Sequence, residues 1–248
     1  MKYLVLGPGG LAMFSLFGFM KRLKEKGLLD DLQEISGSSA GALTAFCYLI
    51  DMSTEDVLKV DIKSLSKFSI KNLIKTGGLI NTEQSIEFLK SLSPVTFAEL
   101  YEKTKVKLHV SALSIEKSSP VYFSVDTAPN MMVADAVLAS MSIPFMFPPH
   151  LGYLDGSLTE ELPWTPFSSC VPDDVLAVRI PWDEMPEAKG PMKMILKTVF
   201  MIFNMRSKFI GPSVNIPIPV NINTYDFKMN HDEKIKLYLL GYSHGYLA

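Results

Sequence analysis

Short apolar runs alternate with longer amphipathic stretches along the first fifty residues of the chain. Residues 2–6 form an apolar run, residues 34–37 fit a short second strand, and small residues follow both segments. Residues 14–26 and 42–50 instead place apolar side chains at helical spacing. An apolar run without polar alternation is typical of a strand that is buried on both faces of a sheet. The order predicts an α/β, three-layer fold with a central, mostly parallel sheet and helices on both faces.

The middle of the chain is polar and has a helical pattern over residues 51–100. Hydroxyl, amide and acidic residues that commonly begin helices stand at 53–56, 81–84 and 94–99. A lysine-rich stretch at 67–78 mixes basic with apolar side chains. This mixture favours a solvated amphipathic helix, and it also fits a segment that covers a site or contacts anionic lipid head groups.

Further strands and one helix are predicted in the second half of the chain. Residues 106–114 and 120–125 are rich in strand-forming residues and close enough in sequence to pair. Residues 133–142 fit a helix that ends before Pro144, and residues 175–180 fit another buried strand.

The C-terminal part, residues 190–248, is less regular. Residues 192–210 are apolar with basic flanks and too short to span a bilayer, so they pack on the body or lie at a membrane interface. Residues 212–223 contain prolines that restrict them to an edge strand or an extended segment, and residues 231–248 fit a closing helix. No repeat or linker interrupts the chain, so a single domain is expected over 1–248.

Composition and charge limit the classes of partner and cofactor. The chain has 248 residues, a net charge of -2 and 20% charged residues, which gives no reason to expect a nucleic-acid partner. The 48% hydrophobic content and 14 methionines fit a large core, an apolar pocket or a membrane-facing surface. Cys47 and Cys170 are the two cysteines and form no disulfide framework or zinc pattern. We expect no metal and no cofactor.

An uncharged stretch from residue 3 to residue 20 could be mistaken for a signal peptide or a membrane span. Pro8, Gly9 and Gly10 interrupt it, and no small-residue cleavage pattern follows. A buried strand, a glycine loop and an amphipathic helix explain the stretch better. We therefore expect a cytoplasmic protein whose membrane contact is peripheral and transient.

One motif in the chain points to nucleophilic catalysis. Between the second strand and its helix stands the sequence Gly37-Ser38-Ser39-Ala40-Gly41, which has the form G-x-S-x-G. In a strand–turn–helix elbow the small neighbours let the serine hydroxyl stand clear of the backbone. The helix N-terminus also favours negative charge at the reacting centre. Ser39 is the candidate nucleophile.

Three blocks, in order, make the chain resemble the patatin-like phospholipase family. They are the glycine loop Gly7-Pro8-Gly9-Gly10-Leu11-Ala12, the serine elbow, and Asp155-Gly156-Ser157 with its flanking prolines, within residues 1–165. The resemblance implies a Ser39–Asp155 dyad without histidine, an acyl-enzyme intermediate, and phospholipase A-type hydrolysis of phospholipid or another acyl-ester lipid. It also implies that the glycine loop supplies the oxyanion donors.

The glycine loop departs from the pattern of that family at three positions. Pro8 replaces the first of three glycines, Ala12 replaces a basic residue, and Met13 replaces a later glycine. Because proline has no N–H to donate, the oxyanion donors are expected to be Gly9, Gly10 and Leu11.

Several alternative interpretations remain open at this point. The glycine loop nearly matches a dinucleotide-binding G-x-G-x-x-A, but no acidic residue ends the second strand. His150, or a later histidine, could complete a triad, whereas His109 lies in a strand pattern and fits a core residue. Phe14 and residues 145–147 fit either an acyl pocket or the core.

Two other functional classes also remain open. One is a serine hydrolase or acyltransferase that acts on neutral lipid or glycolipid. The other is a non-catalytic lipid-binding homologue, which the altered glycine loop would suit.

Overall fold

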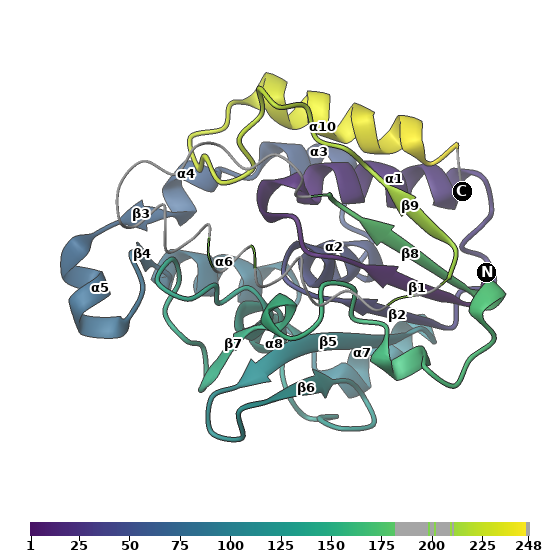
Figure 1. Cartoon of the computed structure of the whole chain (residues 1–248), viewed down its shortest axis with the longest axis horizontal. Helices are drawn as coiled ribbons and strands as arrows, with labels where there is room; N and C mark the ends of the chain where they lie inside the picture. Colours follow the sequence, from purple (N-terminus) through teal and green to yellow (C-terminus); the bar gives the residue numbers. More distant parts are fainter. Residues whose placement is uncertain (182–197, 199–200, 202–208, 210, 247–248) are drawn as a thin grey trace.

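The computed structural model describes residues 1–181, 198, 201, 209 and 211–246. Its centre is a seven-stranded sheet in the order β6-β5-β2-β1-β8-β9, with β7 also paired to β5 (Figure 1). The strands are β1 (Tyr3–Leu6), β2 (Glu34–Gly37), β5 (Lys107–Ser114), β6 (Ser119–Phe123), β7 (Tyr153–Asp155), β8 (Val175–Arg179) and β9 (Ser213–Asn215). Pairs among β5, β2, β1, β8 and β9 are parallel, whereas β6 and β7 run antiparallel to β5. The predicted mostly parallel sheet flanked by helices is confirmed.

Helices and a small second sheet surround this sheet. The α-helices are α1 (Met13–Glu25), α2 (Ala40–Leu49), α3 (Thr54–Lys59), α4 (Ile62–Leu65), α5 (Ile70–Thr76), α6 (Glu83–Leu92), α7 (Phe97–Thr104), α8 (Val133–Ser140) and α10 (His231–His244). The short 3-10 helices are η1 (Gly10–Ala12), η2 (Gly156–Leu158), η3 (Thr165–Phe167) and η4 (Pro172–Asp174). Strands β3 (Lys67–Phe68) and β4 (Ile80–Asn81) form the second sheet beside α5.

The two faces of β1 are buried against different layers. Leu4 and Leu6 belong to the main core, which α1, α2, α8 and α10 share. Val5 points to the opposite face and packs with Leu162 and Phe167 around η3. All three β1 side chains are inaccessible to solvent, which explains why this strand reads as an uninterrupted apolar run.

Strand β5 is longer than β2, and this difference places β7. Gly37 at the end of β2 pairs with Val110, and two residues further along β5 Ala112 pairs with Asp155 of β7. Strand β7 therefore occupies the sheet position that β2 would fill if it continued past Gly37. This arrangement brings Asp155 to the carboxyl end of β2, where the serine elbow begins.

The last helix packs closely on the first one. An added Cβ at Gly18 of α1 would lie 2.1 Å from the Tyr238 carbonyl oxygen, and one at Gly241 of α10 would lie 1.7 Å from the Ser15 carbonyl oxygen. The backbones of α1 and α10 therefore meet at their two glycines. Figure 1 shows α10 along α1 at the edge of the molecule.

Most predicted elements are confirmed within one to three residues. The predicted pairing of 106–114 with 120–125 is confirmed as β5 and β6, and the predicted edge strand after residue 212 is β9, which is shorter than expected. Strands β3, β4 and β7 were not predicted. The stretch 192–210 lies almost entirely outside the described residues. Within the described part of the chain, no helix combines the length and apolarity needed to cross a membrane.

Candidate active site

Ser39 lies on a sharp backbone turn between β2 and α2. Its φ is 53° and its ψ is -120°, and α2 begins at the next residue. A positive φ is unfavourable for a non-glycine residue and persists where the surrounding structure imposes it. The Ser39 N–H donates to the Ser140 Oγ of α8 at 2.8 Å, and this bond fixes the turn against the helix behind it.

The glycines of the elbow are required because the backbones approach too closely for a side chain. A Cβ at Gly41 would lie 2.2 Å from the Leu6 carbonyl oxygen, and a Cβ at Gly37 would lie 2.6 Å from the Ala42 nitrogen. The first turn of α2 can therefore press against the ends of β1 and β2. The predicted strand–turn–helix setting of Ser39 is what the structure has.

Asp155 is completely buried at the end of β7. Its Oδ1 accepts two hydrogen bonds from Ser157, one from the N–H at 2.9 Å and one from the hydroxyl at 2.6 Å. Its Oδ2 meets no donor with hydrogen-bond geometry among the described residues. Burial raises the pKa of Asp155 to about 6, although the Ser157 bonds and the nearby Ser39 hydroxyl lower it.

The glycine loop enters the site from the end of β1. Gly10 has a φ of +53°, and a Cβ there would lie 2.8 Å from the Thr224 carbonyl oxygen and 3.0 Å from the Tyr225 ring. The Leu11 N–H, an expected oxyanion donor, donates to the Thr224 carbonyl oxygen at 2.8 Å. The N–H groups of Gly9 and Gly10 donate to no described residue.

A cavity with almost entirely apolar walls extends from Ser39 and Gly10. Ser39, Ser66, Ser85 and Tyr225 are the described lining residues with polar side chains, and none of the described lining residues is charged. Apolar lining residues include Leu43 and Cys47 of α2, Leu89 and Leu92 of α6, and Met146 and Phe147. Phe14, by contrast, is a core residue without exposure, and Phe145 is 43% exposed on the surface.

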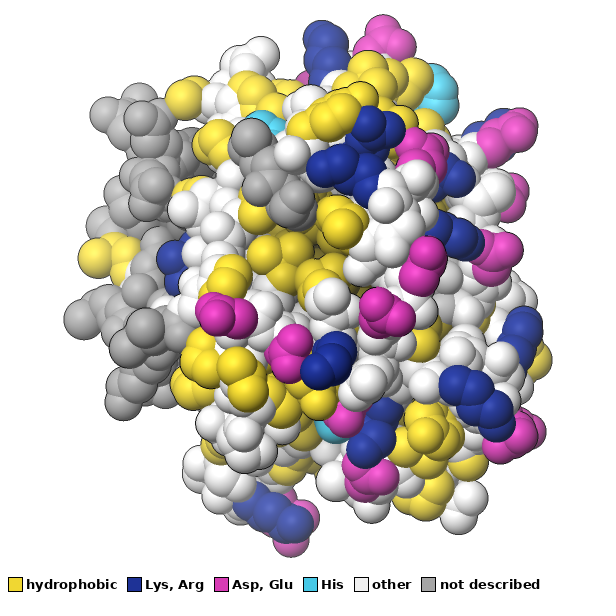
Figure 2. Space-filling view, turned by 90° about the vertical axis from the view of Figure 1, so that its right-hand side faces the viewer, with side chains coloured by type: hydrophobic (Ala, Val, Ile, Leu, Met, Phe, Trp, Pro, Cys, Tyr) yellow, Lys and Arg dark blue, Asp and Glu magenta, His cyan; other side chains and the backbone are white. Residues whose placement is uncertain are grey.

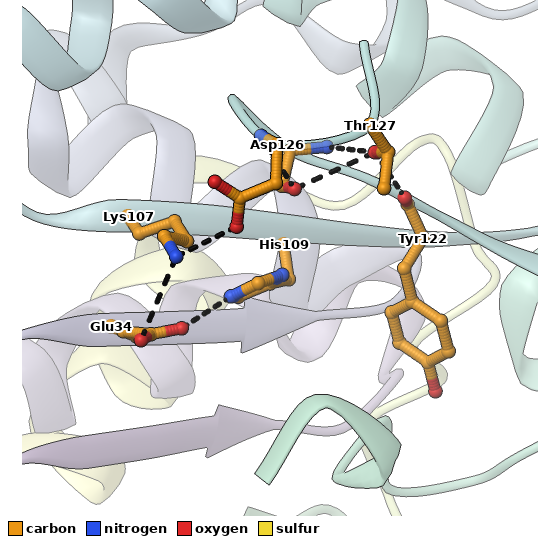
Figure 3. Close-up of polar contacts among 7 residues, drawn as sticks. Glu34, Lys107, His109, Tyr122, Asp126 and Thr127 are labelled. Carbon is orange, nitrogen blue, oxygen red and sulfur yellow. Dashed lines mark hydrogen bonds and ion pairs between the residues drawn. The ribbon is translucent and has the colours of Figure 1, made fainter. Parts of the chain in front are cut away.

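His109, which the sequence assigned to the core, is buried, and its ring packs edge-on against Phe167 on the face of the sheet that Val5 also covers. Its Nε2 lies 2.6 Å from a carboxylate oxygen of Glu34, and Figure 3 shows this pair beside Lys107 and Asp126. In the sheet His109 pairs with Ser36 of β2, but its ring contacts Glu34 at the beginning of that strand and does not line the cavity at Ser39. The expected core role of His109 is confirmed.

The other histidines have different surroundings. His150 lies 2.9 Å from a carboxylate oxygen of Asp135, which also pairs with Lys90. His231 and His244 are the first and last residues of α10. Within the described residues, no histidine lines the cavity beside Ser39.

Three residues near the site escaped the sequence-based prediction. Ser140 holds the Ser39 backbone, Thr224 holds the Leu11 N–H, and Tyr225 packs its ring against Gly10. Burial and the Asp155 charge hold the pKa of Tyr225 well above its usual value, so its hydroxyl stays neutral. No local pattern marks these residues, because each acts on a partner about a hundred or more positions away.

Metal-ligating and thiol chemistry have little support in the described residues. No group of three or more His, Cys, Asp or Glu side chains there is arranged to hold a metal ion. Cys47 lines the cavity, but burial raises the pKa of its thiol to about 12, so it remains protonated.

The family of the chain follows from a direct comparison of sequences. A family model for patatin-like phospholipases matches residues 4–168. The matched range contains the glycine loop, the serine elbow and Asp155. The chain belongs to the patatin-like phospholipase family, as the three blocks suggested.

Similar proteins come from viruses and from yeast. An uncharacterized protein of Acanthamoeba polyphaga mimivirus is 25% identical over 97% of this chain and 91% of its own length. A probable lipid hydrolase of Invertebrate iridescent virus 6 is 28% identical over 65% of this chain. Triacylglycerol lipase 5 of Saccharomyces cerevisiae is 30% identical over 64% of this chain. The alignments cover 61% of the iridescent virus protein and 27% of the yeast lipase.

Solved structures share the fold at low sequence identity. VipD from Legionella pneumophila superposes with a TM-score of 0.56 and 15% identity, covering 99% of this chain and 66% of that one. ExoU from Pseudomonas aeruginosa superposes with a TM-score of 0.53 and 15% identity, covering 98% of this chain and 51% of that one. These two structures extend the fold likeness over the C-terminal part that the family model does not match.

Proposed function

We propose that the chain is a lipid acyl hydrolase of the phospholipase A type, with Ser39 as nucleophile and Asp155 as general base. One observation carries the proposal: a fully buried carboxyl with a raised pKa lies beside a serine on a strained turn, at an uncharged apolar cavity. A carboxylate with a pKa of about 6 is a much stronger base than an ordinary aspartate and is still ionised at neutral pH.

The first half of the reaction acylates the serine. Asp155 takes the proton of the Ser39 hydroxyl as Oγ forms a bond to the acyl carbonyl carbon of the ester. The N–H groups of Gly9 and Gly10 stabilise the resulting oxyanion, since neither donates to a described residue. Collapse of this intermediate breaks the ester C–O bond, and Asp155 returns its proton to the departing alcohol.

The second half frees the enzyme. Asp155 takes a proton from a water molecule, whose oxygen attacks the acyl carbon of the acyl-enzyme. The ester bond to Ser39 breaks, the fatty acid leaves, and the serine oxygen regains the proton. Ser157 keeps Oδ1 of Asp155 occupied throughout, which leaves Oδ2 for the proton transfers.

The Leu11 N–H is reassigned within this proposal. Because it donates to Thr224, it holds the glycine loop in place rather than facing the oxyanion. Thr224 and Tyr225 then anchor the loop in this chain, which has Ala12 at the family's basic position. The close packing of α10 on α1 supports the further proposal that the whole chain is a single domain.

In this proposal the cavity recognises the acyl group of the substrate. The cavity offers apolar contact for a fatty-acyl chain, and a lipid surface is the proposed place of encounter. The same uncharged walls suit the acyl group of a neutral lipid, so triacylglycerol is a second candidate substrate. A panel of esters with one acyl chain and different head groups separates the two candidates.

Covalent trapping tests the assignment of the nucleophile. A fluorophosphonate with an alkyl chain reacts with an activated serine and adds one phosphonyl group, which intact-protein mass spectrometry detects. We expect labelling of the wild type and not of Ser39→Ala. Ser38→Ala is the matched control, because the Ser38 hydroxyl is buried without a partner among the described residues. Labelling of Ser39→Ala at the wild-type rate would overturn the assignment.

A further inference from the structure

A basic lobe projects from the body of the molecule beside the cavity. It comprises residues 62–81, which contain α4, β3, α5 and β4 (Figure 1). The lobe contains four lysines at intervals of four residues, Lys63, Lys67, Lys71 and Lys75, and no aspartate or glutamate. The whole chain, in contrast, has a net charge of -2. The lobe is therefore positively charged, whereas the chain as a whole is slightly acidic.

The same lobe exposes large apolar side chains. Phe68 is 58% exposed, Ile70 is 74% exposed and Ile74 is 84% exposed. Ile70 and Ile74 are one helical turn apart on α5, so they lie on the same face of that helix. Helix α5 buries none of its residues. None of its apolar side chains belongs to the described core, and Ile70 and Ile74 are largely exposed to water.

The lysines of the lobe have no acidic partner in the described part of the chain. No ion pair joins any of the four to a described aspartate or glutamate. The opposite end of the molecule differs, because Figure 2 shows basic and acidic side chains interspersed on that face. A field of one sign combined with exposed isoleucines suits a surface that is both apolar and negatively charged.

The lobe is also continuous with the acyl cavity. Ile62, Leu65 and Ser66 of the lobe line the cavity wall. The Ile80 N–H donates to the carbonyl oxygen of Met146, another lining residue, at 2.9 Å. A lipid surface that contacts the lobe would consequently lie next to the space proposed for the acyl chain.

We propose that the basic lobe is the surface through which the protein docks onto an anionic lipid bilayer. Phe68, Ile70 and Ile74 enter the boundary between head groups and acyl chains, and the lysines contact the lipid phosphates and carboxylates. This inference rests on the proposed function, because it names the surface that delivers a lipid ester to Ser39. The lysine stems lie along the apolar boundary while their ammonium groups remain in water.

Vesicle co-sedimentation tests the docking surface separately from catalysis. The full-length chain with Ser39→Ala is mixed with vesicles of phosphatidylcholine that contain about 30% phosphatidylserine, and with vesicles of phosphatidylcholine alone. We expect the binding constant to be at least about tenfold higher on the anionic vesicles, since each basic residue near such a surface contributes about fivefold. Equal binding to both vesicles, or binding to neither, would overturn the proposal.

Variants at exposed positions then locate the contact. In the same Ser39→Ala chain, Ile70→Ser with Ile74→Ser should weaken binding to anionic vesicles by about tenfold or more, because two large apolar side chains no longer enter the bilayer. Lys71→Glu with Lys75→Glu should weaken it to a similar extent. Unchanged binding in either double variant would overturn the proposal.

Matched controls change the same chemistry elsewhere. Val220 and Leu239 are 76% and 55% exposed outside the lobe, so Val220→Ser with Leu239→Ser controls for lost apolar surface. Lys117→Glu with Lys236→Glu controls for charge, because both lysines are exposed. The controls should stay within about twofold of the parent. Hydrolysis of a soluble short-chain ester by the wild type is measured in parallel, and its failure would count against the proposed function alone.

Discussion

Leu11 donates its backbone N–H to the carbonyl oxygen of Thr224 at 2.8 Å. This bond joins the glycine loop at the start of the chain to a segment more than two hundred residues later. The Tyr225 ring lies beside the same loop, close to where a Cβ on Gly10 would stand. The position of the proposed oxyanion donors therefore depends on the C-terminal part of the chain, beyond the range that the family model matches.

Gly10→Ala is expected to lower kcat for ester hydrolysis about a hundredfold or more, the usual effect of losing one oxyanion donor. The new Cβ would lie 2.8 Å from the Thr224 carbonyl oxygen, so the loop must move away from its anchor. Steady-state kinetics on a soluble ester measures the loss.

Gly152→Ala is the matched control for Gly10→Ala. Gly152 also has a positive φ, +82°, but no atom lies within 4 Å of its added Cβ. The control therefore has the same backbone penalty, about 1 kcal/mol, without a collision at the site. Equal losses of kcat in the two variants would contradict the role of the glycine loop.

Asp155→Asn should lower kcat/KM by roughly a hundredfold to ten-thousandfold, since it removes the general base and keeps the shape of the side chain. In the wild type the base must be ionised, so log kcat/KM should rise with pH and level off above about 6, the raised pKa of Asp155. A pH–rate profile from about pH 4.5 to about pH 8 measures this. A profile that is flat through pH 6 would contradict the assignment of Asp155 as base.

The same substitution should make the folded protein more stable at neutral pH. The pKa of Asp155 is raised from 3.8 to about 6 on folding, so the wild type loses stability as pH rises between those values. This loss is up to about 3 kcal/mol, and the neutral amide of the variant avoids it. Denaturant unfolding should show Asp155→Asn to be more stable by about 1 to 3 kcal/mol at pH 7, with the gain disappearing near pH 4. A wild type more stable than the variant at pH 7 would contradict burial of an ionised carboxylate.

Val60→Phe should shift the preference for acyl-chain length. Val60 lines the cavity and is only partly buried, so a phenyl ring can fit there and fill space that a long chain would use. We expect kcat/KM for a long-chain ester to fall about tenfold or more, with little change for an acetyl ester. Val60→Ala is the control that widens the cavity, and a parallel fall for both esters in Val60→Phe would contradict the acyl-chain assignment.

The serine elbow could be predicted from sequence because its requirements are local. Gly37 and Gly41 have no room for a side chain, the short strand Glu34–Gly37 leads into the turn, and the helical run that follows forms α2. Strand β1 could be predicted equally well, because a strand that is buried on both faces requires an uninterrupted apolar sequence.

The remaining parts of the site depend on distant contacts. Strand β7 has three residues, too few for a periodic pattern, and it exists because β5 extends past the end of β2. Ser140 and Thr224 act through single hydrogen bonds to residues 101 and 213 positions away, which no local pattern encodes. The resemblance to the family pointed to Asp155, whereas its burial became visible only in the fold.

The most direct test of the proposed dyad is fatty-acid release from phospholipid vesicles in the presence of a chelator, comparing the wild type with Ser39→Ala. The account predicts steady release by the wild type and a loss of at least about a thousandfold in the variant, the scale expected for removal of a nucleophile. Circular dichroism confirms that both proteins are folded. Equal release by the two proteins would contradict the account.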